Sequence, residues 1–361
     1  MSNISKYDSN MLAPNVTDGV AWYDLSLLGV EGLGWTDTNH PLDRLPAHAQ
    51  GQVTEAVWNL SQHSAGLCVR FKTNAVSLDA RWTLRFENLA MDHMPATGCS
   101  SVDLYVLDDK QKWRWLGIGR NPTFPLSQAS LVSELTPNER QYLLYFPLYN
   151  GVSQVEIGLP PEAALCVAPP RKDKPICIYG TSIVQGGCAS RPGLAYPSIL
   201  GRRLNRQVIN LGFLGSAKAE PEMTKLLAQL NPAVFIIDSL PNADVNVGVD
   251  VNEQRLEHLV RSLLEARPTT PILFIEYIVY RKQHLAQEPQ TTRNTRNGYW
   301  HTARQRLQDN PPKNLHLLHD LSGDNLLGHD TEATVDGVHP NDLGFMRMAD
   351  VIEPVLRKIL G

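Results

Sequence analysis

The sequence predicts an all-β sandwich domain followed by an α/β domain built on a parallel sheet. Short alternating apolar stretches, separated by turn-forming residues, recur through the first 170 residues and are typical of a sandwich. From residue 175 onward, strand-like and helix-like segments alternate, as they do in proteins with parallel sheets. Between the two halves, residues 168–175 hold three prolines and four charges, a composition typical of a linker. We therefore expect two domains, residues 1–170 and 171–361.

In the first half, the strands are expected where apolar residues alternate with polar ones. These stretches are residues 53–58, 66–72, 76–84, 102–107, 112–117, 141–148 and 152–159. Their regular spacing and the turn formers between them favour two packed antiparallel sheets.

In the second half, the expected strands are residues 176–180, 207–212, 233–238, 271–277 and 315–319. Helical patterns cover residues 193–204, 218–230, 254–267, 293–308 and 341–360. Asn341 or Asp342 is placed to cap the last helix. Five strand–helix units predict a parallel sheet that is covered by helices on both faces.

The composition is that of an ordinary globular protein, with 42% hydrophobic residues, 19% charged residues and a formal net charge of -4. This mild acidity, without a block of Lys and Arg, gives no reason to expect nucleic acid as a partner. The longest apolar runs are too short to span a bilayer, so no membrane partner is expected. Residues 1–10 lack the apolar core of a signal peptide, and we therefore expect a cytoplasmic protein.

The five cysteines form no CxxC pair, so neither a disulfide scaffold nor a zinc site is predicted. Cys188 is expected to be a packed thiol. The loop after the first strand of the second half shows no clear phosphate cradle, which argues against bound FMN. The sequence therefore predicts no metal and no cofactor.

Residues that can perform nucleophilic catalysis follow the strands of the second half. The carboxyl ends of parallel strands meet at one edge of a sheet, so the residues that follow them are expected to converge. Ser182 follows the first strand, and Asp336 and His339 precede the last helix. A serine hydroxyl needs a base to remove its proton, and His339 can act as that base while Asp336 orients the imidazole. We predict that Ser182, His339 and Asp336 form a catalytic triad.

Donors for the charge that develops on an ester's carbonyl oxygen are expected at the same edge. The second strand runs into the glycine-rich stretch Asn210-Leu-Gly-Phe-Leu-Gly215, and Asn242 follows the third. We predict that the backbone N–H groups of Ser182 and Gly215 and the side-chain amide of Asn242 form the oxyanion hole. Each feature alone is also explained as an ordinary turn or helix entry, but their order at successive strand ends favours catalysis.

Two further segments could contribute polar groups to this edge. Residues 293–300 either reach the site or begin an ordinary amphipathic helix. Glu276 lies at the end of the fourth strand, as a polar group of the cleft or as a partner for an arginine, and we do not assign it a catalytic role.

The motifs resemble those of the SGNH hydrolases, also called GDSL-type esterases, from Pro175 to the C-terminus. Gly180-Thr-Ser-Ile183 is similar to their Gly-Asp-Ser-Leu block and implies that Ser182 is the nucleophile. Asn210–Gly215 is similar to their second block and implies Gly215 as an oxyanion donor, while Asp336-Gly-Val-His-Pro340 matches the last block. The resemblance implies a three-layer α/β/α fold of flavodoxin type.

The chain departs from this family pattern in two of the motif blocks. Thr181 stands where the family has Asp, and the third block, usually Gly-x-Asn-Asp, is represented only by Leu240-Pro-Asn242. Thr97-Gly-Cys-Ser-Ser-Val-Asp-Leu-Tyr105, together with residues 179–193, resembles two-domain bacterial members of the family. In those members an N-terminal β-sandwich with a Gly-x-Asp-Leu-Tyr-like motif precedes the hydrolase domain.

The sequence thus predicts a serine esterase that cleaves small acyl esters, acetyl esters above all, through an acyl-enzyme intermediate. Some relatives remove acyl groups from carbohydrates, so the resemblance implies a small-molecule or carbohydrate ester as substrate. Two alternatives stay open. One is a lipase or general aryl esterase, and the other is a carbohydrate-binding protein with a degenerate hydrolase domain, which the change at Thr181 favours. The particular ester, the oligomeric state and the role of the first domain are left open.

Overall fold

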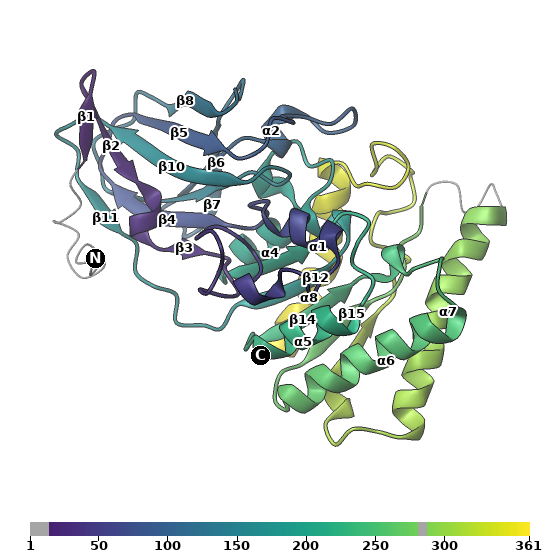
Figure 1. The fold of residues 1–361 in the computed structure, drawn as a ribbon. Helices are drawn as coiled ribbons and strands as arrows, with labels where there is room; N and C mark the ends of the chain where they lie inside the picture. Colours follow the sequence, from purple (N-terminus) through teal and green to yellow (C-terminus); the bar gives the residue numbers. More distant parts are fainter. Residues whose placement is uncertain (1–13, 281–286) are drawn as a thin grey trace. The chain divides into compact units, whose positions relative to one another are not determined.

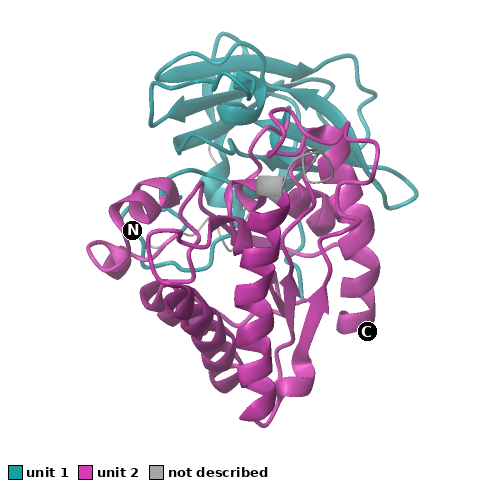
Figure 2. Cartoon of the chain, turned by 90° about the vertical axis from the view of Figure 1, so that its right-hand side faces the viewer, with its two compact units in different colours: residues 1–44, 62–172, 190–193 teal, residues 45–61, 173–189, 194–361 magenta. Residues whose placement is uncertain are grey.

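The computed structural model describes residues 14–280 and 287–361 (Figure 1). The chain divides into two compact units, which Figure 2 shows in teal and magenta. Unit 1 comprises residues up to Arg44, Gln62–Lys172 and Ser190–Gly193, and unit 2 comprises Leu45–Ser61, Asp173–Ala189 and Leu194–Gly361. Along the chain, the boundary between Lys172 of unit 1 and Asp173 of unit 2 therefore falls within the proline-rich stretch 168–175.

Unit 1 is a sandwich of two antiparallel sheets, as the sequence predicts. The first sheet has the order β1-β2-β10-β5-β8, with β1 Asn15–Thr17, β2 Val20–Asp24, β10 Val152–Leu159, β5 Leu78–Leu84 and β8 Leu126–Val132. The second has the order β11-β4-β9-β6-β7, with β11 Leu165–Val167, β4 Cys68–Thr73, β9 Arg140–Tyr145, β6 Asp103–Leu107 and β7 Trp113–Ile118. The short strand β3, Val30–Glu31, pairs with β4, and the helix α2, Ala96–Cys99, precedes β6.

The core of unit 1 is built from residues of both sheets, and β5 shows the alternation of buried and partly exposed residues most clearly. In β5 the buried residues are Leu78, Ala80, Trp82 and Leu84, and the residues between them are partly exposed. They join Val69 and Phe71 of β4 and Leu144 of β9 in one cluster. This period-two burial is the alternation from which the sandwich is predicted.

The strand predicted at residues 53–58 is wrong, because residues 55–58 form the first part of a helix. This helix, α1, spans Glu55–Ser61 and belongs to unit 2. Thr54 explains the helix start, since its Oγ1 accepts a hydrogen bond from the backbone N–H of Val57 at 3.3 Å. A threonine in this position satisfies a donor that a helix N-terminus leaves open.

Asp103, at the start of β6, joins the two segments that resemble those of the two-domain family members. Its buried carboxylate accepts hydrogen bonds from Arg191 Nη1 at 2.9 Å and from the Gly193 backbone N–H at 2.8 Å. The other oxygen accepts from Trp115 Nε1 at 2.9 Å. The Arg191 guanidinium lies 4.9 Å from the Trp115 ring and 5.3 Å from the Tyr105 ring. The motif of the β domain thus holds residues 190–193, which follow the predicted nucleophile by eight positions.

Unit 2 is built on a five-stranded parallel sheet in the order β13-β12-β14-β15-β16. Its strands are β12 Ile176–Gly180, β13 Val208–Gly212, β14 Val234–Asp238, β15 Ile272–Ile275 and β16 Leu318–Leu321. In order of sequence this is the arrangement 2-1-3-4-5 of flavodoxin-like folds. The first four strands are buried along their whole length, as expected when helices cover both faces.

The helices of unit 2 fall into two groups (Figure 1). On one face α4, Tyr196–Arg203, packs against α8, Asp342–Leu360, and on the other α6, Val249–Ala266, packs between α5, Pro221–Gln229, and α7, Gln287–Asp309. Asn341 caps α8 as predicted, with its side chain accepting from Gly344 N at 3.0 Å. The predicted strand 315–319 is wrong in its first half, where Leu315–Leu317 form a 3-10 turn. No helix in the described residues is long and apolar enough to cross a bilayer.

Candidate active site

Ser182 is positioned by the end of β12 and by the short helix α3, Ser182–Gln185. Parallel pairing aligns Gly180 with Gly212 of β13 and with Asp238 of β14, so three strand ends lie side by side. A side chain on Gly180 would place its Cβ 2.3 Å from the carbonyl oxygen of Asp238, so only glycine fits. Ser182 is therefore the first residue of a helix that begins at the carboxyl edge of the sheet.

Thr181, which stands where the family usually has Asp, caps the N-terminus of α3. Its Oγ1 accepts a hydrogen bond from the backbone N–H of Ile183 at 3.2 Å and caps α3. Threonine and aspartate are both favourable N-cap residues. The substitution at Thr181 therefore keeps the turn that presents Ser182.

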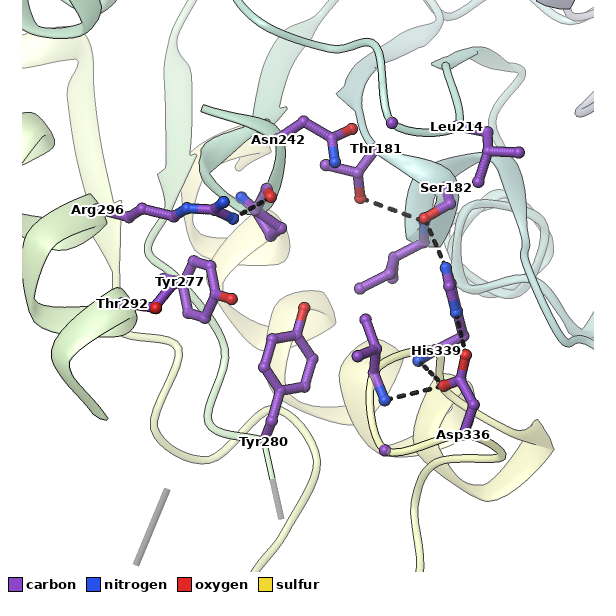
Figure 3. A pocket seen from close by; sticks show the side chains of 15 residues that line it. Thr181, Ser182, Leu214, Asn242, Tyr277, Tyr280, Thr292, Arg296, Asp336 and His339 are labelled. Carbon is purple, nitrogen blue, oxygen red and sulfur yellow. Dashed lines mark hydrogen bonds and ion pairs between the residues drawn. The ribbon is translucent and has the colours of Figure 1, made fainter. Parts of the chain in front are cut away.

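The structure brings Ser182, His339 and Asp336 together in one hydrogen-bonded chain (Figure 3). Ser182 Oγ lies 2.9 Å from His339 Nε2, and His339 Nδ1 lies 2.7 Å from Asp336 Oδ2. Ser182 is buried, and only 6% of its surface is exposed. This is the arrangement in which imidazole can take a proton from the serine while the carboxylate fixes its tautomer.

Asp336 is tuned to remain ionised. Burial alone would raise the pKa of Asp336, but hydrogen bonds from the His339 side chain and from the backbone N–H groups of His339 and Val338 outweigh it. The net result is a pKa of about 2. Asp336 therefore carries its charge across the range in which an esterase works, and can balance a positive charge on the imidazole.

The predicted oxyanion donors lie on the same pocket wall. Gly215 adopts a positive φ of +65, a backbone conformation that favours glycine. A side chain would have room there, since a Cβ at this position would meet nothing within 4 Å. Asn242 ends a 3-10 helix, Leu240–Asn242, after β14, and its Oδ1 accepts from Ala217 N at 3.4 Å. That bond turns its Nδ2 toward the space in front of Ser182 (Figure 3). The roles of Ser182 N, Gly215 N and Asn242 Nδ2 as oxyanion donors stay predictions.

Asn210 of β13 holds the helix α3, which begins at Ser182. Its Nδ2 donates to the Val184 carbonyl at 2.7 Å, and its Oδ1 accepts from Gly212 N at 2.9 Å. A side chain on Gly212 would place its Cβ 2.1 Å from Gln185 N. The residues of the second motif block thus hold α3 close to β13, which the sequence pattern alone does not reveal.

The pocket in front of Ser182 has a volume of about 500 Å³ and extends well beyond the triad. Its far side is lined by Tyr277, Tyr280, Thr292 and Arg296, which the sequence prediction does not identify individually (Figure 3). They come from the segment after β15 and from the first part of α7. The order of strand ends in the sequence could not predict that residues of α7 line the pocket, because this helix reaches the pocket only through tertiary packing.

The segment 293–300 plays both of the roles considered for it. Arg296 lines the pocket, whereas Trp300 is buried and stacks on Phe274 with ring centroids 3.5 Å apart. Glu276 pairs with His301 Nε2 at 3.0 Å and does not line the pocket. Cys188 is buried, as expected for a packed thiol.

A parallel sheet that carries these groups at its carboxyl edge defines an α/β ester hydrolase. Residues 173–357 match the model of the GDSL-like lipase/acylhydrolase family, and residues 20–165 match the model of the N-terminus of SGNH-hydrolase-type esterases. The chain belongs to the GDSL-like lipase/acylhydrolase family and is an ester hydrolase with the N-terminal domain of this type. The predicted family and fold class are therefore confirmed.

Several solved structures are similar to this chain over most of its length. A GDSL-like lipase from Bacteroides ovatus ATCC 8483 is 30% identical, with a TM-score of 0.86 over 94% of this chain and 98% of that one. A salicylyl-acyltransferase from a tetracycline biosynthetic pathway is 16% identical, with a TM-score of 0.74 over 95% and 98%. An acetyl xylan esterase from the rumen bacterium Butyrivibrio proteoclasticus is 13% identical, with a TM-score of 0.55 over 94% and 99%. At this identity the last two show a shared fold alone. A search among curated proteins finds no match.

Proposed function

We propose that this protein is a serine esterase that removes small acyl groups, acetyl above all, from carbohydrate esters. The observation that carries the proposal is the chain of hydrogen bonds from Ser182 Oγ through His339 to Asp336, at 2.9 Å and 2.7 Å. The choice of a carbohydrate substrate is supported by structural neighbours, which include an acetyl xylan esterase and a family two carbohydrate esterase from Cellvibrio japonicus.

In the first half of the reaction, Ser182 Oγ forms a bond to the ester's carbonyl carbon while its proton passes to His339 Nε2. The carbonyl oxygen becomes negatively charged and accepts hydrogen bonds from Ser182 N, Gly215 N and Asn242 Nδ2. The bond to the alcohol then breaks, and the alcohol oxygen takes the proton from Nε2. The acyl group is left on Ser182.

In the second half, water attacks the acyl carbon and gives a proton to His339 Nε2. The bond to Ser182 Oγ breaks, Oγ recovers that proton, and the carboxylic acid leaves. Asp336 remains ionised throughout and offsets the charge on the imidazolium in both halves.

Acetate release from acetylated oligosaccharides tests this function. Wild type is expected to release acetate from at least one acetylated xylan or cello-oligosaccharide, and the Ser182→Ala variant is expected to release none. A series of 4-nitrophenyl acetate, octanoate and palmitate tests the acyl length. A preference for palmitate, or acetate release that survives Ser182→Ala, would contradict the proposal.

A further inference from the structure

The pocket is larger than hydrolysis of an acetyl group requires, and the excess lies on one side. At about 500 Å³ it is within the range of sites that enclose whole small molecules. Figure 3 shows Arg296 and Thr292 on the side of the pocket opposite His339, with Tyr280 between them and the triad. We call the part lined by Tyr277, Tyr280, Thr292 and Arg296 the polar arm.

Tyr280 contributes a buried hydroxyl to the polar arm. Its side chain is only 7% exposed, and its Oη has no hydrogen-bond partner among the described residues. Burial raises the pKa of Tyr280 well above its usual range, so the hydroxyl keeps its proton and can donate it. A buried hydroxyl is normally paired, and an acceptor supplied by a ligand would satisfy this one.

Arg296 adds a cation that pairs with no carboxylate among the described residues. Its Nη1 donates to the Pro241 carbonyl, and its guanidinium lies 5.5 Å from the Tyr277 ring. The other arginines of α7 pair with carboxylates: Arg293 with Asp324, Arg304 with Asp320 and Arg306 with Glu253. In the described part of the chain no carboxylate pairs with Arg296. It is therefore the α7 arginine whose charge is left for a ligand.

We infer that the polar arm binds a carboxylate carried by the substrate, so that the preferred esters are acidic. Arg296 and Tyr280 both donate hydrogen bonds, and a carboxylate only accepts them, in a geometry that a guanidinium fits well. The carboxylate belongs to the acyl chain or to the alcohol, whichever part of the ester lies toward α7 from Ser182. This inference rests on the proposed esterase function and names the chemical class of its substrate.

Two pairs of esters test it, each matched in shape and different in charge. Monoethyl glutarate and the ethyl ester of glutaric monoamide test the acyl side by ethanol release. 4-Acetoxybenzoate and 4-acetoxybenzamide test the alcohol side by acetate release. In wild type, kcat/KM is expected to be at least about tenfold higher for the carboxylate in one pair, because a charge-assisted pair is formed only there.

Variants of the polar arm identify the source of that preference. Arg296→Gln is expected to reduce the carboxylate-to-amide ratio to near one, Arg296→Lys to retain part of it, and Tyr280→Phe to reduce it a few-fold. Arg304→Gln, on the same helix but outside the pocket, is the control and should keep the wild-type ratio. Because Arg296 also holds Pro241, beside Asn242, a loosened oxyanion hole would slow both members of a pair and leave their ratio unchanged.

The inference is overturned if neither pair shows a preference for the carboxylate in wild type, or if the preference survives both Arg296→Gln and Tyr280→Phe. If wild type hydrolyses no ester of either pair and no acetylated oligosaccharide in a manner that depends on Ser182, the proposed function itself fails. The two failures are therefore distinguishable.

Discussion

Asp336 holds His339 at two points, through the ring and through the backbone. Its Oδ2 lies 2.7 Å from His339 Nδ1, and its Oδ1 accepts from the His339 backbone N–H at 2.8 Å. The same carboxylate therefore fixes both the position of the residue and the tautomer of its imidazole. A three-residue spacing is enough for this, because Gly337 turns the chain with φ +90 between them.

This relationship predicts the effect of Asp336→Asn. An amide at this position can keep the bonds from the backbone but would donate to Nδ1, which forces the proton onto Nε2 and removes the base for Ser182. We expect kcat to fall on the order of 10³–10⁴-fold with little change in KM. Steady-state kinetics on 4-nitrophenyl acetate measures it. Asp330→Asn, which removes an exposed carboxylate paired with Arg347, is the control and should leave kcat unchanged. A loss of less than tenfold in Asp336→Asn would show that Asp336 does not orient the base.

The predicted role of Asn242 as an oxyanion donor sets the expected effect of Asn242→Ala. Removing one donor of this kind typically costs about 2.7–4 kcal/mol of transition-state stabilisation, which corresponds to a loss of roughly 10²–10³-fold in kcat. Because the donor acts on charge that develops only in the transition state, KM should change little. If kcat stays within threefold of wild type and the variant is folded, Asn242 is not a donor.

Asp238 predicts how stability depends on pH. The carboxyl is buried at the end of β14 and accepts from Tyr196 Oη at 3.1 Å. Burial raises the pKa of Asp238 to about 6, and the bond from Tyr196 opposes this in part. A raised pKa means that the folded state binds the proton more tightly than the unfolded state. The contribution of protonated Asp238 to the free energy of unfolding is therefore complete below about pH 4 and is lost as the pH rises through about 6.

The Asp238→Asn variant should remove this dependence, because the amide can still accept from Tyr196 and carries no charge. About two pKa units correspond to roughly 3 kcal/mol at most, so the variant should gain up to that amount relative to wild type between pH 4 and pH 8. Urea denaturation across this range measures the free energy of unfolding. A stability difference between variant and wild type that is the same at every pH would contradict the assignment.

The Asp103 cluster predicts a large stability effect in unit 1. Replacing Asp103 by Ala leaves Arg191 without its carboxylate and removes the acceptors of Gly193 N and Trp115 Nε1. Breaking a buried pair in this way typically costs on the order of 3–5 kcal/mol. Glu139→Gln, which removes an exposed pair with Lys72, is the control and should cost less than about 1 kcal/mol. Equal effects on the free energy of unfolding would show that the cluster is not a structural anchor.

The sequence was sufficient to place Ser182, Asp336 and His339 near one another, because parallel strands deliver their carboxyl ends to one edge. It was also sufficient to predict the sandwich, because the alternation of apolar and polar residues in the sequence matches the alternating burial seen in β5. It did not identify the helix at residues 55–61, where an apolar run resembles a strand and the cap at Thr54 decides the outcome. Nor did it show the contact between Asp103 and Arg191, which lie far apart in the chain and meet only after folding.

The polar arm shows the same limit. Tyr280 and Arg296 come from different segments, and no local pattern distinguishes Arg296 from the other arginines of α7. What sets Arg296 apart is the lack of a carboxylate partner among the described residues, which is a property of the packed structure.

Covalent labelling of the serine tests the central claim most directly. A fluorophosphonate probe reacts with a serine that a neighbouring base activates. Wild type at neutral pH is expected to take up one probe, with the adduct on Ser182 by peptide mass spectrometry. Ser182→Ala should take up none, whereas Ser216→Ala, which removes a nearby hydroxyl after Gly215, should label like wild type. Equal labelling of wild type and Ser182→Ala, or no labelling of folded wild type, would contradict the assignment of Ser182 as the nucleophile.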